Sequence, residues 1–307
     1  MQDQEIGLKR SILAAESLDA LTAINATIEG HAVFLQNLLA DRLKFHEAAR
    51  KASEFFLVDD LKEDAWIHER ITHIRAVQVE QVYIGGYRFI AYQNKLGGTP
   101  LIWNVLANPP QRSSMITQPE TYTKIPPPIP DYKTKFAALR LDAGLDDNWA
   151  YSAMGIGDFQ LRGILAEVDK ATRERIMRGV SETVYVEMAH KNELSKEIEI
   201  SLFKFKNEQD AGLMIEAVEK MTVQSFKDIE RNPQLRLRDY TIQPYSLGTA
   251  SGTKRQYTLE AFLLGKNTLM QILLRRGNIV VEFAESESGL SLPQISKVIG
   301  ESIEQMK

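Results

Sequence analysis

The sequence predicts an α+β protein in which a helical N-terminal part precedes a C-terminal part of helices packed on an antiparallel sheet. Apolar residues in the first third recur at helical spacing, whereas the last third holds alternating segments joined by short turns rich in Gly and Asn. A proline-rich stretch separates the two parts. We therefore expect a helical domain over residues 1–123, a stiff linker over 124–131 and an α+β domain over 132–307.

The N-terminal domain is expected to contain at least three helices. Apolar residues recur every three or four positions from Ala20 to Ala40. A second helix is expected over residues 62–93, bent at Gly85-Gly86 and ended by Gly97-Gly98. A short helix over residues 101–108 then stops at two prolines.

The C-terminal domain mixes helical and strand patterns. Four segments are predicted to be helical, the last of them amphipathic: residues 152–168, 171–180, 207–229 and 292–306. The alternation of polar and apolar residues predicts a strand at residues 197–206. Three more strands follow one another through short turns, which indicates an antiparallel meander: residues 255–265, 267–277 and 278–286.

The composition excludes several classes of function. With 37 Lys and Arg against 41 Asp and Glu, the 307-residue chain has a net charge of −4, which does not favour a nucleic-acid partner. No apolar run reaches the roughly 18 residues that a membrane span requires. Cysteine is absent, so disulfides, thiolate nucleophiles and thiolate metal sites are excluded.

One acidic residue stands out in the first apolar helix. Between Ala20 and Ala40 the titratable side chains are Glu29 and His31, and no Lys or Arg accompanies them. An unpaired carboxylate in a core costs several kcal/mol in order of magnitude. Glu29 must therefore pair with an arginine, lie near the surface, take up a proton or bind a metal. An ion pair is the commoner solution for a buried charge, and a metal is the alternative.

Two segments look like the zinc motif HExxH but lack its geometry. That motif places two histidines at i and i+4, about 40° apart around a helix. His68 and His73 are five residues apart, about 140° around a helix, and Arg50 stands where a second histidine should follow His46. We interpret these histidines as solvated helix residues. An enzyme of another class that uses one of them stays open as an alternative.

Six segments in a fixed order carry a family resemblance: Gln2-Asp3-Gln4, ATIEGHA at residues 26–32, YIGGYRF at 83–89, Gly97-Gly98, PPQRSSMITQPETY at 109–122 and GDFQLRGIL at 157–165. Together they resemble bacterial zinc metallopeptidases of the HExxH, gluzincin-like kind. In that family a second helix supplies the third zinc ligand from an EG-containing pattern, so the resemblance implies this position for Glu29. It also implies a substrate cleft near five residues: His31, Ser113, Ser114, Gln118 and Tyr122.

The chain departs from the family pattern in two ways. By the resemblance, the HExxH helix with two ligands and the general base would lie immediately before Met1, so the chain is either a truncated fragment or a non-catalytic relative. Gln118 stands where the family commonly has histidine, and glutamine carries no positive charge at neutral pH. The two losses favour an inactive metallopeptidase-like protein. The alternative is a peptide- or protein-binding module that uses the former substrate cleft.

The resemblance also sets expectations for cofactor, partners and localisation. Zn²⁺ is the family cofactor, and we expect it to be absent or weakly bound here. Without an HExxH helix, the helix from Ala20 to Ala40 would expose apolar surface, so we expect a homodimer. The relatives are mostly exported, as periplasmic proteins, lipoproteins or extracellular proteins. The chain shows no signal peptide, and its localisation stays open.

Overall fold

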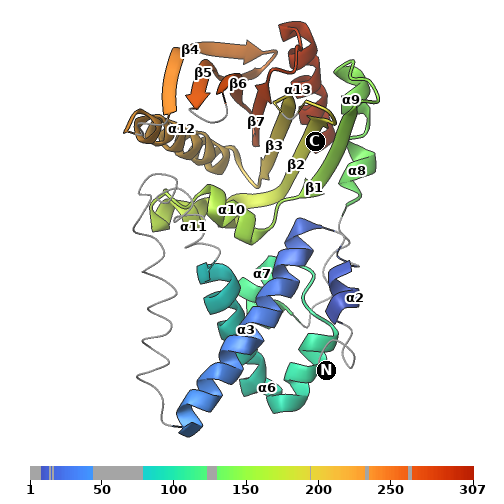
Figure 1. The fold of residues 1–307 in the computed structure, drawn as a ribbon, viewed down its shortest axis with the longest axis vertical. Coiled ribbons are helices and arrows are strands. Elements are labelled where there is room, and N and C mark those ends of the chain that lie inside the picture. Colours follow the sequence, from blue (N-terminus) through green and yellow to red (C-terminus); the bar gives the residue numbers. More distant parts are fainter. Residues whose placement is uncertain are drawn as a thin grey trace. The chain divides into compact units, whose positions relative to one another are not determined.

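The computed structural model describes eight stretches of the chain: residues 8–13, 15, 17–43, 79–122, 130–193, 195–231, 235–261 and 265–307. The chain divides into two compact units. The first comprises Met1–Pro128 and Gly157–Ala166, and the second comprises Ile129–Ile156 and Glu167–Lys307. The α+β class is confirmed, because one unit is helical where described and the other is built on a sheet (Figure 1). Most of the expected linker, up to Ile129, lies outside the described residues and stays a prediction.

The described elements of the first unit are all helical. They are α2 (Leu8–Leu13), α3 (Leu18–Leu43), η1 (Val79–Gly85), α6 (Gly86–Ala107), α7 (Ser113–Thr117), η2 (Pro119–Thr121) and α10 (Asp158–Ile164). At the start of α3 the Ser17 hydroxyl accepts a hydrogen bond from the Ala20 amide at 3.0 Å, as expected of a helix cap. Aromatic and aliphatic side chains of α3 and α6, Phe34, Phe89 and Val105 among them, form the core of this unit.

Helix α6 is broken where the sequence predicted. Gly98 has φ 64° and ψ −159°, a backbone conformation that glycine adopts without strain, and Pro100 follows it inside the helix. The helix then resumes as far as Ala107. The bend expected at Gly85-Gly86 coincides with the junction between η1 and α6.

The second unit is built on a seven-stranded sheet in the order β1-β2-β3-β7-β6-β5-β4, with every neighbouring pair antiparallel. The strands are β1 (Trp149–Gly155), β2 (Val180–His190), β3 (Glu197–Phe205), β4 (Leu235–Leu247), β5 (Ala250–Ala261), β6 (Gly265–Arg276) and β7 (Ile279–Ser286). The helices are α8 (Tyr132–Lys135), α9 (Ala138–Asp142), α11 (Lys170–Gly179), α12 (Glu208–Arg231) and α13 (Leu292–Met306). The predicted meander β5-β6-β7 is confirmed.

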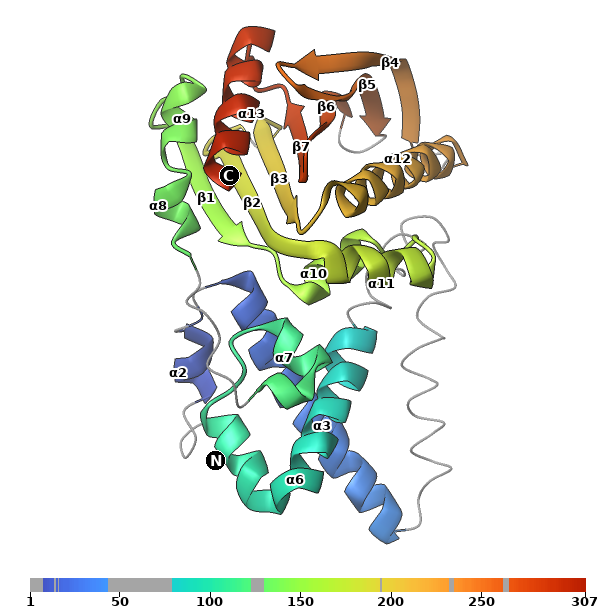
Figure 2. The ribbon, with the colours of Figure 1, turned by 180° about the vertical axis from the view of Figure 1, so that it is seen from behind.

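The two faces of the sheet are covered by different helices (Figures 1 and 2). Alternate strand residues point to opposite faces. Ile200, Leu274 and Phe283 belong to the core that includes the apolar side of α13. Phe203 and Leu273 point the other way, to the face on which α12 lies, and both are fully buried. None of the described helices is both long and apolar enough to cross a membrane.

Three sequence-based predictions need correction. The helix expected over residues 152–168 is wrong at its start, because residues 152–155 belong to β1 and helix α10 covers only Asp158–Ile164. Strands β2 and β4 were not predicted. Strand β4 lies at an edge of the sheet and is mostly exposed on both faces, so its sequence shows little apolar alternation. It also contains Pro244, a residue that sheets tolerate at their edges.

Candidate functional site

Glu29 and His31 lie on different sides of helix α3. Two residues apart on a helix means about 200° of rotation, so their side chains diverge. Glu29 is half-buried and makes no hydrogen bond or ion pair within the described part of the chain. His31 is 8% exposed, and its ring centre lies 6.5 Å from that of Trp103. Burial lowers the pKa of His31, which favours the neutral form of the ring. The ion pair that periodicity favoured for Glu29 is thus not formed among these residues.

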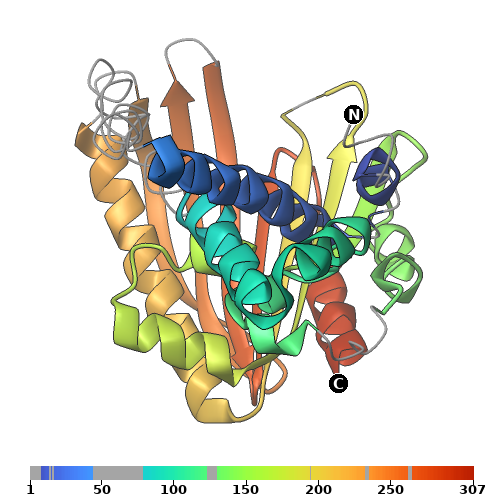
Figure 3. The same ribbon diagram turned by 90° about the horizontal axis from the view of Figure 1, so that it is seen from below.

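The glycine beside Glu29 has a packing role. Helix α3 crosses the start of α6 at Gly30, where a methyl group would lie 2.6 Å from the Gly86 Cα and closer still to its carbonyl (Figure 3). A methyl group on Gly86 would in turn overlap the Ala26 carbonyl group. Two of the segments that carry the family resemblance, ATIEGHA and YIGGYRF, therefore meet backbone to backbone. This contact places the part of α3 that carries Glu29 directly against the start of α6.

Ser113 belongs to a buried polar cluster with Asp19. The Asp19 carboxylate, in the first turn of α3, accepts the Ser113 hydroxyl and the Ser113 amide, the latter at 3.0 Å. The Ser113 hydroxyl oxygen accepts the Phe159 amide of α10 at 3.2 Å. Burial raises the pKa of Asp19 above its ordinary value, and the Ser113 hydrogen bonds oppose that rise. The cluster ties α3, α7 and α10 together, which accounts for Ser113 structurally.

The remaining cleft candidates follow Ser113 in the chain. Ser114 is half-buried and Gln118 is exposed. The Tyr122 hydroxyl donates to the Asn108 carbonyl at 2.6 Å, and the Tyr122 ring meets Phe89 edge to face with 5.6 Å between ring centres. Within the described residues, no hydrogen bond joins any of the five cleft candidates to Glu29. Their assignment to a substrate cleft stays a prediction.

Whether a zinc ion fits at Glu29 depends on the other metal ligands nearby. A protein zinc site with an open position needs three protein ligands. No group of three or more His, Asp or Glu residues that could hold a metal occurs among the described residues. His46, His68 and His73 lie outside them. The described residues by themselves therefore do not fit a zinc ion, and no catalytic step is derived through one.

Sequence reasoning missed a polar cluster on the α12 face of the sheet. The Tyr185 hydroxyl of β2 donates to Glu199 of β3, and Gln271 of β6 donates to Glu282 of β7 at 2.5 Å. Burial raises the pKa of Glu282, with the Gln271 hydrogen bond opposing it, and burial together with the Glu199 and Glu187 charges raises that of Glu197. These carboxyl groups therefore bind protons more readily than free glutamate does.

Arg255 supplies positive charge to this cluster. It is 1% exposed, and its guanidinium contacts Glu219 of α12 at 3.2 Å and the Gln271 amide oxygen at 3.3 Å. The cluster thus spans five neighbouring strands, from β2 to β5 in the sheet order, and one helix. Only the alternation of Glu197 and Glu199 with isoleucine could have indicated it, because the sheet order that joins these strands is not local in sequence.

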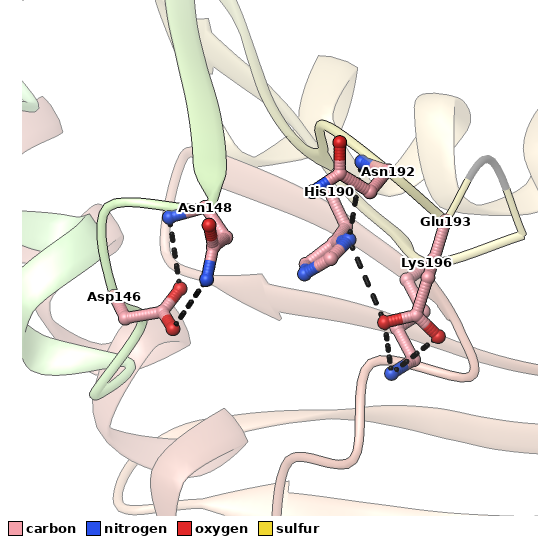
Figure 4. A network of polar contacts seen from close by, with 6 residues as sticks. All are labelled: Asp146, Asn148, His190, Asn192, Glu193 and Lys196. Carbon is pink, nitrogen blue, oxygen red and sulfur yellow. Dashed lines mark hydrogen bonds and ion pairs between the residues drawn. The ribbon is translucent and has the colours of Figure 1, made fainter.

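A further polar network lies at the ends of β1, β2 and β3 (Figure 4). Asp146 accepts the backbone and side-chain N–H groups of Asn148, both at 3.0 Å. The His190 Nδ1 lies 3.6 Å from Glu193, whose second oxygen contacts Lys196 at 2.8 Å. The Lys196 hydrogen bond lowers the pKa of Glu193. These contacts close the turns that flank the strands, and we assign them a structural role.

Comparisons with known proteins give no family. No family model matches the sequence, and no curated protein matches it. Among solved structures, the chain is similar to the extracellular domain of PknH from Mycobacterium tuberculosis, with a TM-score of 0.36 and 7% identity. That alignment covers 59% of this chain and 98% of the PknH domain. A likeness this low carries no functional argument.

Proposed function

We propose that this chain is a metallopeptidase-like protein without peptidase activity of its own, and that it acts as a peptide-binding module. The observation that carries the proposal is the half-buried Glu29 carboxylate, which has no partner within the described residues. Such a carboxylate keeps its lone pairs available to the N–H groups of a bound peptide. The resemblance to zinc metallopeptidases rests on the six sequence segments that follow one another in the order found in that family.

The proposed absence of catalysis rests on the zinc ligands and the general base that the sequence lacks. The sequence contains no HExxH segment, so neither the histidine pair nor the general base of the family is present in it. Glu29 has no neighbouring ligands among the described residues. A carboxylate that once completed a metal site would then serve as a hydrogen-bond acceptor.

The proposal also includes a homodimer. Leu35, Leu38 and Leu39 on α3 are exposed by 39%, 42% and 57%. A second copy of the chain could cover these leucines, which supports self-association of the first unit.

Two measurements test the function. The purified chain is equilibrated with zinc, desalted and subjected to metal analysis and to assays with internally quenched peptides; we expect far less than one equivalent of zinc and no cleavage. One equivalent of zinc with cleavage that Glu29→Gln abolishes would overturn the proposed inactivity.

The binding role is tested on a peptide array. We expect a subset of peptides to bind the wild-type chain and to lose binding to Glu29→Gln. The matched control is Asp41→Asn, which removes an exposed carboxylate from the C-terminal end of α3, outside the candidate cleft, and should leave binding unchanged. Background binding to every peptide would refute the module.

A further inference from the structure

A cavity of about 280 Å³ lies in the second unit between α11 and α12. The two helices contact each other and cross at an angle (Figure 3). The volume of the cavity is slightly below the roughly 300–1,000 Å³ that is typical of pockets for drug-sized ligands. The space therefore suits one long side chain or a small molecule.

The lining of the cavity has an apolar floor and a charged rim. Leu213, Ala217 and Met221 are spaced at i, i+4 and i+8 on α12, which places them on one face of that helix. Glu216 and Lys220 form a neighbouring stripe on the same helix. Such a surface suits a ligand that is apolar along its length and polar at its tip.

The net charge of the rim favours a ligand of the opposite charge. Glu167, Asp169 and Glu216 oppose a single cation, Lys220, so the rim carries a net charge of −2. The Asp169 carboxylate already caps α11 by accepting the Thr172 amide at 3.0 Å. Glu167 and Glu216 are exposed and make no hydrogen bond or ion pair within the described residues. These two carboxylates are available to an incoming cation.

We propose that this cavity binds the side chain of an arginine or lysine from a peptide segment of another protein. The hydrocarbon stem would lie on the Leu213, Ala217 and Met221 floor, and the cationic tip would meet Glu167 and Glu216. Arginine is the stronger candidate, because its planar guanidinium matches two carboxylates at once. The site lies in the second unit and does not depend on the metallopeptidase resemblance or on Glu29.

The test follows amide signals of the ¹⁵N-labelled chain by NMR during titration with blocked five-residue peptides. The central residue is arginine, lysine, the short-stemmed cation diaminopropionate, or glutamate. We expect the arginine peptide to shift signals of residues 167–172 and 213–224, the diaminopropionate peptide to bind more weakly and the glutamate peptide not to bind. No shift there with arginine, or equal shifts with glutamate, would overturn the proposal.

Charge variants make the test directional. Glu167→Gln with Glu216→Gln should raise the Kd for the arginine peptide by about two- to thirtyfold at low salt, because two exposed ion pairs are lost and each contributes about 1.4- to fivefold. Lys220→Met should lower the Kd, since it removes the competing internal cation. Glu230→Gln, on α12 outside the cavity, is the control and should leave the Kd unchanged. A Kd that changes equally in all three variants would refute the site.

A last measurement distinguishes a cationic side chain of a peptide from a free polyamine. Free spermidine carries ammonium groups on a hydrocarbon stem, as lysine does, but has no peptide backbone. We expect it to bind more weakly than the arginine peptide. Tighter binding of spermidine to the same residues would overturn the assignment of a peptide. The titrations of the wild-type chain with the four peptides use no variant, so the proposal stays testable if a variant fails to fold.

Discussion

The close crossing of α3 and α6 allows a sharp prediction for Gly30→Ala. The added methyl group would lie 2.6 Å from the Gly86 Cα, whereas non-bonded carbons prefer about 3.5–4.0 Å. The helices would have to separate by about 1 Å or more. The atoms that the methyl group meets belong to backbone and cannot rotate away as a side chain would. The substitution should therefore disturb the packing of Phe34 and Phe89 around the crossing.

The magnitude follows from two opposing effects. Overpacking a core costs about 1–3 kcal/mol, and the backbone contact places this case at the upper end. Alanine recovers about 0.8–1.0 kcal/mol of helix propensity relative to glycine. We expect a net loss of about 2 kcal/mol in the free energy of unfolding of the first unit. For a unit of this size, the melting midpoint should fall by roughly 5–9 °C.

The assay compares thermal unfolding by circular dichroism with hydrogen exchange in peptides from α3 and α6. Exchange is needed because the chain has two units, and a single melting curve does not assign the loss to one of them. Gly163→Ala on α10 is the matched control, since a methyl group there meets nothing within 4 Å. It should be neutral or slightly stabilising. If Gly30→Ala were as stable as Gly163→Ala, the crossing would be looser than described and the reasoning would fail.

Two further predictions concern buried polar groups. Because the pKa of Glu282 is raised in the folded chain, its contribution to stability is full below about pH 4.5 and is lost as pH rises through the raised value. Glu282→Gln should therefore stabilise the second unit at pH 7 and reduce its gain on acidification to pH 5, measured by denaturant unfolding; an unchanged pH dependence would contradict this. Ser113→Ala should lower the free energy of unfolding by about 1–3 kcal/mol, because Asp19 and the Phe159 amide each lose a hydrogen bond to the Ser113 hydroxyl. The neighbouring Ser114→Ala should cost little, and equal losses in a melting experiment would argue against the cluster.

Much of the fold could be predicted because its signals are local. The amphipathic spacing of α13, the polar start and apolar stripe of α12 and the short turns of the β5-β6-β7 meander all lie within a few residues of one another. The break at Gly98 was predicted for the same reason, since it depends on the glycine itself. Strand β4 escaped prediction because an exposed edge strand has no buried face to impose alternation.

The candidate sites depended on contacts between distant parts of the chain. The sequence determined that Glu29 is an isolated acid in an apolar helix, but only the tertiary structure decided that no arginine reaches it within the described residues. Ser113 joins Asp19 and Phe159 across 94 and 46 residues of sequence, and the sheet order brings Glu199 and Glu282 together. Periodicity and turn chemistry act over a few residues and are readable from sequence. Burial, pairing and pKa depend on which distant segments pack together, and that is decided by the folded chain as a whole.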